Sequence, residues 1–285
     1  MVILRSLLFV PAGRERMLEH ARSSRADALV LDLEDAVPAR HKAAARTLAR
    51  RWIPLLAKRS RPIFVRVNGL ASGLTRDDLL AVVSKPLAGV ILPKTDTPQD
   101  LRALDVLLRE AEMAAGVRPG DVRSIALIES ARAILRCEEI ARASDRLLAL
   151  SIGGEDYTRD IGARRDTEGL ALQHIRAVVV QVAAAYGLVA IDTPYTTLND
   201  ETGLAEDARI ARAIGLRGKY AIHPAQAPVI NRAFSPTDDE IHEATRLVEA
   251  FEAGTGGAIS VDGRMVDAPI VERARATLAA AKRRG

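Results

Sequence analysis

Short apolar runs alternate along the chain with longer segments in which apolar residues recur at helical spacing. Each run has the length of a β-strand and is bounded by polar or glycine residues. The segment after the fourth run is typical of the helical ones, because it begins with Thr97 as a cap and Pro98 in its first turn, and ends before Gly116. Eight strand-like runs occur, at residues 7–10, 29–33, 63–67, 90–92, 125–128, 147–152, 189–191 and 220–222. The alternation predicts an α/β fold, a closed (β/α)8 TIM barrel.

Residues beyond the eighth run exceed what a minimal barrel needs. We predict a barrel catalytic domain at residues 1–235 and a C-terminal helical extension at residues 236–285, which would act as a lid packed on the barrel or on a neighbouring subunit. The extension is predicted to hold a helix at Asp238–Glu252, a glycine-rich turn at residues 254–257, a hairpin turn at Asp262 and Gly263, and a final helix at Pro269–Lys282. Within the barrel, the sixth connection is predicted to be helical over residues 168–186.

The composition excludes several classes of protein. Only 3% of the residues are aromatic, too few for base-stacking platforms, and no nucleic-acid-binding motif is present. The net charge is +4, but the arginines are interspersed with acids, which suits a small anionic ligand better than nucleic acid. Cys137 is the single cysteine, so neither a disulfide framework nor a thiolate metal site is possible within one chain.

Two further patterns are missing from the sequence. No apolar run approaches the ~20 residues of a membrane-spanning helix, and no leader-type sequence precedes the first run. Gly13 stands alone after that run, where a dinucleotide-binding site would need GxGxxG. We therefore expect a cytoplasmic protein with no membrane or nucleic-acid partner.

Charged residues follow most of the strand-like runs. Because a barrel gathers the carboxyl ends of its strands at one face, these residues are candidates for an active site. They are Asp32, Glu34 and Asp35 at the end of the second run, Arg66 and the uncharged Asn68 at the end of the third, then Lys94, Glu129, Glu155, Asp156, Asp192 and His223. Unpaired buried ions cost several kcal/mol each, so we expect these charges to pair with one another, with a metal ion or with substrate.

Glu129 and Asp156 follow neighbouring runs, with a helix-like segment at residues 131–143 between them. Two carboxylates at adjacent strand ends suit Mg²⁺, which keeps most of its coordination positions for water and substrate. Gly153 and Gly154 would let the backbone approach a ligand beside Asp156. Alternatively, the two acids form ordinary salt bridges at the rim.

Arg66 and Lys94 each allow two interpretations. The guanidinium of Arg66 suits a carboxylate or enolate oxygen, but it could instead be a structural partner of Asp32 or Glu34. Lys94 could form a Schiff base with a carbonyl substrate, although neighbouring acids would hold it as an ammonium ion in a salt bridge. A lone histidine such as His223 is a base or, more often, a hydrogen-bonding residue, and no second ligand stands at zinc spacing.

The chain resembles the citrate lyase beta-subunit family, which groups with malyl-CoA and citramalyl-CoA lyases in the HpcH/HpaI aldolase superfamily. The resemblance runs nearly end to end. The matching motifs are RSLLFVPA at the start, LVLDLEDAV at 29–37, RVN at 66–68, LPKTD at 92–96, IES at 128–130, GGEDYTRDIG at 153–162, GKYAIHPAQ at 218–226 and DGRMVDAPIVERA at 262–274. One departure is PAGR at residues 11–14, where relatives often carry a Gly-Asn pair.

This resemblance implies a barrel with Mg²⁺, for which Mn²⁺ could substitute, held by Glu129 and Asp156. Arg66 would contact the substrate carbonyl or enolate, with Glu129 beside it, and Asp267 would come from the lid of a neighbouring subunit to exchange a proton with the enolate. Asp32, Glu34 and Lys94 would surround these residues without covalent chemistry. A homotrimer is the oligomer that the family analogy implies.

The expected reaction is Mg²⁺-dependent cleavage of a β-hydroxyacyl-CoA, of the citryl-, citramalyl- or malyl-CoA type, to acetyl-CoA and a keto acid through an enolate. The alternatives are a malyl-CoA thioesterase on the same barrel and a subunit that works only in a citrate lyase complex with an acyl carrier protein. Candidates for CoA contact, chosen by charge and expected position at the rim, are Arg5, Arg14 and Lys42.

Overall fold

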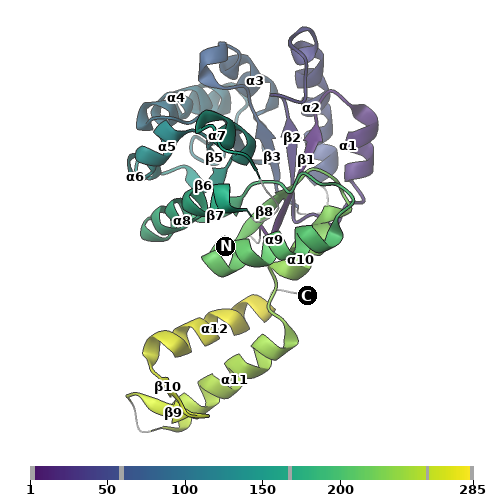
Figure 1. Ribbon diagram of the computed structural model, residues 1–285. Helices are drawn as coiled ribbons and strands as arrows, with labels where there is room; N and C mark the ends of the chain where they lie inside the picture. Colours follow the sequence, from purple (N-terminus) through teal and green to yellow (C-terminus); the bar gives the residue numbers. More distant parts are fainter. Residues whose placement is uncertain (1–3, 58–60, 166–168, 255–256, 283–285) are drawn as a thin grey trace. The chain divides into compact units, whose positions relative to one another are not determined.

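The computed structural model describes residues 4–57, 61–165, 169–254 and 257–282. Its larger part is a closed barrel of parallel strands with helices around the outside (Figure 1), which confirms the predicted fold class. The strands follow one another in chain order, and the first also pairs with the last, so the sheet has no free edge. They are β1 (Ser6–Pro11), β2 (Ala28–Asp32), β3 (Ile63–Arg66), β4 (Leu87–Leu92), β5 (Arg123–Ile128), β6 (Leu147–Ile152), β7 (Val189–Asp192) and β8 (Gly218–Ala221).

Helices connect the strands on the outer face of the barrel. They are α1 (Glu15–Ala21), α2 (Lys42–Leu56), α3 (Thr75–Val82), α4 (Pro98–Ala114), α5 (Ala131–Leu135), α6 (Cys137–Ala141), α7 (Gly154–Asp160), α8 (Leu170–Ala185), α9 (Glu201–Ile214) and α10 (Gln226–Ala233), with short 3-10 turns η1 (Ala39–His41) and η3 (Leu70–Ser72). The helix predicted at residues 131–143 is two helices, because the backbone leaves helical geometry at Arg136. The start of the one predicted at 168–186 lies outside the described residues.

The interior of the barrel is filled by every second residue of the strands. Its packed residues are Leu7, Ala28, Val30, Phe64, Ile91, Ile125, Leu127, Ala149, Ile191 and Tyr220, with Leu4 below them. Since side chains alternate across a strand, the same alternation places Asp32, Arg66 and Glu129 on the inner side at the carboxyl ends. β4 begins three residues before the predicted run, because Gly89 interrupts the apolar pattern where the Phe64 ring packs against it.

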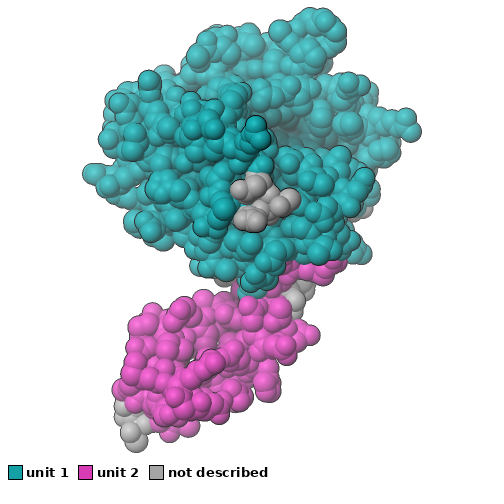
Figure 2. Space-filling view, in the orientation of Figure 1, with its two compact units in different colours: residues 1–231 teal, residues 232–285 magenta. Residues whose placement is uncertain are grey.

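The chain divides into two compact units, residues 1–231 and residues 232–285, which Figure 2 shows in separate colours. The second unit contains α11 (Asp238–Ala253), the antiparallel strands β9 (Ile259–Val261) and β10 (Arg264–Val266), and α12 (Ala268–Lys282). Asp262 and Gly263 both have positive φ, as a two-residue hairpin turn requires, so the predicted turn is confirmed there. Part of the predicted turn at 254–257 lies outside the described residues. That this unit packs on the barrel or on a neighbouring subunit stays a prediction.

No helix in the described part of the chain is both long and apolar enough to cross a membrane.

Candidate active site

Arg66 and Asp32 end neighbouring strands and form a two-point ion pair. The register of β2 and β3 places them directly opposite each other. Arg66 Nε and Nη2 donate to Asp32 Oδ1 and Oδ2, both at 2.7 Å, and the guanidinium lies over the Phe9 ring, 4.9 Å from its centroid. Burial alone would lower the pKa of Arg66, but the hydrogen bonds and charge of Asp32 raise it above its ordinary value. Arg66 is therefore a fixed and permanent cation.

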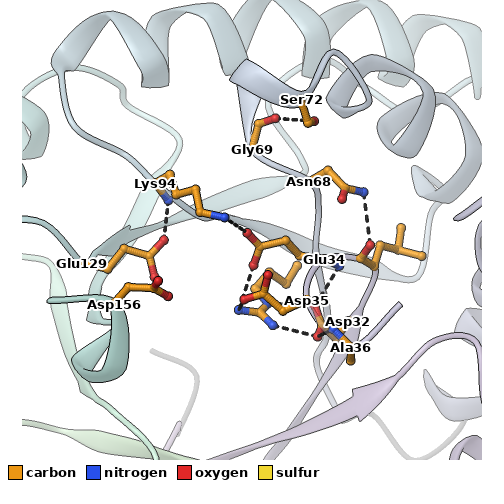
Figure 3. Close-up of polar contacts among 12 residues, drawn as sticks. Asp32, Glu34, Asp35, Ala36, Asn68, Gly69, Ser72, Lys94, Glu129 and Asp156 are labelled. Carbon is orange, nitrogen blue, oxygen red and sulfur yellow. Dashed lines mark hydrogen bonds and ion pairs between the residues drawn. The ribbon is translucent and has the colours of Figure 1, made fainter. Parts of the chain in front are cut away.

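Glu34 bridges Arg66 to Lys94. Its Oε2 lies 2.9 Å from Arg66 Nη1, and its Oε1 accepts a hydrogen bond from Lys94 Nζ at 2.6 Å (Figure 3). Burial raises the pKa of Glu34 although both cations act to lower it. The hydrogen bond to Glu34 raises the pKa of Lys94. Lys94 is thus stabilised as an ammonium ion, which opposes the Schiff-base chemistry that needs a free amine.

The backbone of Lys94 connects this chain of charges to Glu129. Lys94 has φ 53°, in the left-handed region that residues with side chains seldom adopt. In this conformation its N–H donates to Glu129 Oε1 at 2.6 Å while its side chain reaches Glu34. One residue in an unusual conformation therefore holds two of the carboxylates in place, as strained residues at active sites often do.

Glu129 is a buried carboxyl group directed at a second acid. It follows β5, and only 5% of it is exposed. Its pKa is raised to about 8. Burial is the largest cause, the negative charges of Asp156 and Glu34 act in the same direction, and the N–H of Lys94 acts in the opposite direction. In Figure 3 the carboxyl groups of Glu129 and Asp156 lie next to each other. Such a pair can hold either a shared proton or a cation between its oxygens.

Gly153 is the reason that Glu129 can occupy this position. It follows β6 opposite Glu129, and its N–H donates to the Ile128 carbonyl at 3.0 Å. A Cβ on Gly153 would lie 2.4 Å from Glu129 Oε2 and 2.6 Å from Glu129 Cβ. The missing side chain of Gly153 therefore makes room for Glu129. That Gly153 also lets the backbone approach a ligand stays a prediction.

Asp156 comes from the first turn of α7, directly after the glycine pair. Its Oδ1 lies 2.5 Å from Nη2 of Arg159, one helical turn further on. The Arg159 side chain is 76% exposed, so this ion pair is weak and a cation between the two acids can displace it.

A cavity of about 460 Å³ brings the predicted residues together. Asp32, Arg66, Glu129 and Asp156 line it, and Phe9, Leu127 and Tyr220 provide apolar surface below them. Glu34 and Lys94 lie on a neighbouring cavity of about 860 Å³, and Asp35 lies on both. A charged cleft with an apolar floor is typical of a small-molecule site.

The pair Glu129 and Asp156 fits a hard divalent cation. Within the described residues no group of three or more His, Cys, Asp or Glu side chains is placed to hold a metal. At this site the protein therefore provides two carboxylates as candidate metal ligands. Mg²⁺ is often bound by one or two carboxylates, with water and substrate completing its octahedron. A cation between them would also offset the repulsion from Asp156, which, after burial, helps to raise the pKa of Glu129.

Asp192 ends β7 but points away from this cavity. Its side chain faces the helix layer, where Arg176 Nε and Nη2 donate to it at 3.0 and 2.8 Å and Lys219 Nζ at 2.6 Å. The expectation that Asp192 belongs to the charged rim was wrong. Side chains alternate along a strand, and that of Asp192 lies on the outer face of the barrel wall, whereas those of Asp32 and Arg66 lie on the inner face.

Of the three candidates for CoA contact, Arg5 needs correction, because it does not lie at the expected rim. The candidates Arg14 and Lys42 stay predictions. Arg5 precedes β1 and pairs with Asp27, which precedes β2, so it lies at the amino ends of the strands, away from the cavity. Lys42 donates to the carbonyls of Leu33 and Glu34 and to Asn68 Oδ1, all within 2.8 Å, and so ties the loop after β2 to the loop after β3.

Two other expected residues have different settings. His223 is exposed and accepts the N–H of Ala225 at its Nδ1, 3.2 Å away, which is a hydrogen-bonding arrangement. Asp267 belongs to the second unit, between β10 and α12, where its carbonyl accepts the N–H groups of Ile270 and Val271. That Asp267 exchanges a proton with the enolate in the site of a neighbouring subunit stays a prediction.

Two residues in the cavity wall escaped the sequence analysis. Phe9 stacks on Arg66, and Thr193 Oγ1 accepts the N–H of Gly154 at 3.0 Å. Neither carries a charge, so a search for charged residues at strand ends passes over them. The alternation of side chains along a strand could have identified them, because each lies two residues from an inward-facing core residue, Phe9 from Leu7 and Thr193 from Ile191.

The chain is similar to several known proteins over nearly its whole length. The chain is 38% identical to citrate lyase subunit beta of Escherichia coli (strain K12), over 99% of this chain and 94% of that protein. It is 36% identical to a (3S)-malyl-CoA thioesterase of Cereibacter sphaeroides (strain ATCC 17025 / ATH 2.4.3), over 98% of this chain and 94% of that one. A crystal structure of CitE from Mycobacterium tuberculosis, in complex with magnesium, acetoacetate and coenzyme A, superposes with a TM-score of 0.82 at 31% identity and covers 98% of both chains.

Residues 5–224 match the sequence profile of HpcH/HpaI aldolase/citrate lyase proteins. The match covers the whole barrel, and the full-length identity to citrate lyase beta subunits confirms the resemblance seen in the motifs. The chain is therefore a lyase-type enzyme that belongs to the HpcH/HpaI aldolase/citrate lyase family.

Proposed function

We propose that this enzyme is a Mg²⁺-dependent lyase that cleaves a β-hydroxyacyl-CoA, of the citryl-, citramalyl- or malyl-CoA type, to acetyl-CoA and a keto acid. The observation that carries this proposal is the buried carboxyl of Glu129, which faces Asp156 in the same cavity as the fixed cation Arg66. The relative from M. tuberculosis that binds magnesium, acetoacetate and coenzyme A supports the ligand class.

In this proposal Glu129 and Asp156 hold the metal ion. Mg²⁺ bound there would act as a Lewis acid on the hydroxyl and carboxylate oxygens of the substrate, and Mn²⁺ could take its place. The C–C bond next to the hydroxyl-bearing carbon breaks as the hydroxyl proton leaves. The electron pair of the broken C–C bond forms the enolate of the acetyl-CoA product, and the hydroxyl group becomes the carbonyl of the keto acid.

Arg66 is placed to stabilise the enolate oxygen. A guanidinium has five N–H donors, and the contacts to Asp32 and Glu34 use three of them. The other two are available to a substrate oxygen in the cavity. Because Asp32 fixes the orientation of the group, little reorganisation is needed as negative charge develops, and a donor of this kind contributes about 3–4 kcal/mol to transition-state stabilisation.

Asp267 completes the proposed site. Delivered by the second unit of a neighbouring subunit, its carboxyl group would protonate the enolate carbon, and the unit would exclude water from the cavity. The arrangement requires an oligomer, which the family analogy makes a trimer.

Metal dependence and product identity test the proposal. The purified protein is incubated with citryl-, citramalyl- and malyl-CoA, and the products are identified by mass spectrometry. We expect acetyl-CoA and the matching keto acid, loss of activity with EDTA, and recovery with Mg²⁺. Full activity in metal-stripped enzyme would contradict the proposal.

A thioesterase is the second candidate, favoured by the 36% identity to malyl-CoA thioesterases. The same cavity would then admit a water molecule to the thioester carbonyl. Free CoA and intact malate in the malyl-CoA reaction would identify this activity. Turnover only after addition of an acyl carrier protein would instead indicate a subunit of a citrate lyase complex, as the likeness to citrate lyase beta subunits allows.

A further inference from the structure

A buried group of four charges lies outside the barrel wall, between β7, β8, α8 and α9. Arg176 Nη2 contacts Asp192 Oδ2 at 2.8 Å and Asp207 Oδ1 at 2.6 Å, and Lys219 Nζ lies 2.6 Å from both acids. Arg176, Asp192 and Lys219 are at most 1% exposed. The charges of the two cations and two anions cancel, and the group takes no part in the chemistry proposed above.

This group reaches the active site through one backbone atom. Besides its two carboxylate partners, Lys219 Nζ donates to the carbonyl oxygen of Thr193 at 2.8 Å. The same Nζ donates to Asp192 Oδ2 at 2.6 Å and forms an ion pair with Asp207 Oδ2. The buried ion group therefore fixes the position of Thr193, the first residue after β7.

Thr193 in turn contacts the first residue of the helix that carries Asp156. Its Oγ1 accepts the N–H of Gly154 at 3.0 Å, and both groups are buried. The packing is close, because a Cβ on Gly154 would lie 2.9 Å from Thr193 Oγ1 and 3.1 Å from Thr193 Cγ2. Asp156 follows two residues later, so its place depends on where this contact sets the helix start.

A second contact joins the same two segments. Arg165 donates from Nη2 to the carbonyl of Pro194 at 3.0 Å and from Nη1 to Glu155 Oε1 at 2.6 Å. The loop after β7 is thus joined to the two residues that precede Asp156, to Gly154 directly and to Glu155 through Arg165. The hydrogen bond from Gly154 to Thr193 is buried, whereas the ion pair between Arg165 and Glu155 is exposed.

We propose that Thr193 is a positioning residue, whose hydroxyl sets the start of α7 and thereby places the carboxylate of Asp156 beside Glu129, with the buried charges behind it as the anchor. The proposal rests on the proposed role of Asp156 as a metal ligand. Groups that orient metal ligands commonly change metal affinity by about 10- to 100-fold when they are removed.

The test measures metal affinity, which needs no knowledge of the substrate. Binding of Mn²⁺ to the full chain is titrated by the electron paramagnetic resonance signal of the free ion, together with the melting temperature. We expect Thr193→Val, which keeps the shape but loses the acceptor, to weaken Mn²⁺ binding about 10-fold or more. Thr193→Ser, which keeps the hydroxyl, should stay within about two-fold of the unchanged protein. Thr193→Ala gives the same comparison if the valine variant does not fold.

Thr75→Val is the matched control. Thr75 is also buried, and its hydroxyl donates to a backbone carbonyl, that of Asn68, at 2.8 Å, but it contacts no part of α7 in the described structure. The Thr75→Val substitution should lower the melting temperature and leave the Mn²⁺ affinity unchanged, as expected for the loss of a purely structural hydroxyl.

Two results would overturn the proposal. One is a folded Thr193→Val or Thr193→Ala protein that binds Mn²⁺ as tightly as the unchanged chain. The other is a serine variant that binds as weakly as the valine variant, because the hydroxyl would then not be the group that matters. If the unchanged chain itself binds no Mn²⁺, the proposed metal site fails, which is a separate and recognisable outcome.

Discussion

At the scale of single residues, the carboxyl group of Glu129 has the most unusual environment in the site. It lies beneath the surface beside another acid, and the N–H of Lys94 is the hydrogen-bond donor that contacts it. In the absence of a cation, binding a proton relieves the cost of burying the negative charge of Glu129 beside Asp156. The metal ion and the proton therefore compete for the same oxygens.

This competition predicts a pH-dependent metal affinity. Because the pKa of Glu129 is raised to about 8, the metal-free protein holds a proton there at neutral pH, and binding a cation must release it. Mn²⁺ affinity should rise up to about tenfold per pH unit between about pH 6 and 8, and level off above that. Calorimetric titration in buffers of different ionisation enthalpy measures the released proton. An affinity that is flat across this range would refute the prediction, and Glu129→Gln should abolish the proton release.

Arg66 gives a second prediction at this scale. Arg66→Lys keeps the charge but cannot make the two-point contact with Asp32, so the donor to the enolate oxygen loses its orientation. We expect kcat for cleavage to fall about 10²- to 10³-fold. The matched control is Arg46→Lys, because Arg46 and Arg66 are each 14% exposed and each pairs with a buried aspartate. This control should lose stability but keep kcat within a few-fold, and a similar loss of kcat in both variants would argue against a specific role.

At the scale of elements, the direction in which a strand-end residue points matters more than its charge. The apolar runs in the sequence located the strand ends within a few residues, and the charges after them located the site. Alternation along each run could also have separated Asp32, Arg66 and Glu129, which face inward, from Asp192, which faces the helices. The left-handed turn at Lys94 could not have been foreseen, because it depends on partners 60 and 35 residues away along the chain, Glu34 and Glu129.

The end of β6 provides a prediction for an element rather than for a reacting group. Gly153→Ala would place a methyl group 2.4 Å from Glu129 Oε2, so Glu129 or the strand end must move. We expect a loss of about 1–3 kcal/mol in the free energy of unfolding and weaker Mn²⁺ binding. In the control Gly13→Ala, the added methyl would meet its neighbours at 3.8 Å, an ordinary contact, and should change neither quantity. Unchanged Mn²⁺ binding in Gly153→Ala would show that Glu129 is not held as described.

At the scale of the whole molecule, the chain consists of a barrel and a smaller unit that carries Asp267. The sequence predicted an extension with two helices and a hairpin turn after the eighth run, and that it is a separate domain beginning at residue 236 stays a prediction. Assembly of several chains cannot be read from one sequence, because it depends on surfaces that meet only in the oligomer.

Mixed oligomers test whether Asp267 acts between subunits. Asp267→Asn and Glu129→Ala are each expected to abolish cleavage, the first by removing the acid and the second by removing the metal ligand. If lid and barrel of one site come from different chains, random co-assembly of equal amounts pairs an intact barrel with an intact lid in about a quarter of the sites. Co-expression of the two variants with different tags should therefore restore about a quarter of the activity. No recovery in mixed oligomers would place Asp267 in its own subunit's site.

Closure of the barrel between β1 and β8 has a consequence for how the chain is made. Ser6 pairs with Lys219, so the first strand has no partner on one side until more than two hundred further residues have been synthesised. At ribosomal speeds of about 5–20 residues per second, this edge waits on the order of 10–40 s. During that interval the nascent chain exposes unpaired backbone groups of an apolar strand, which favour association with other chains. The topology therefore sets a period in which the emerging amino-terminal half carries an unpaired strand edge, and this period ends when the eighth strand leaves the ribosome.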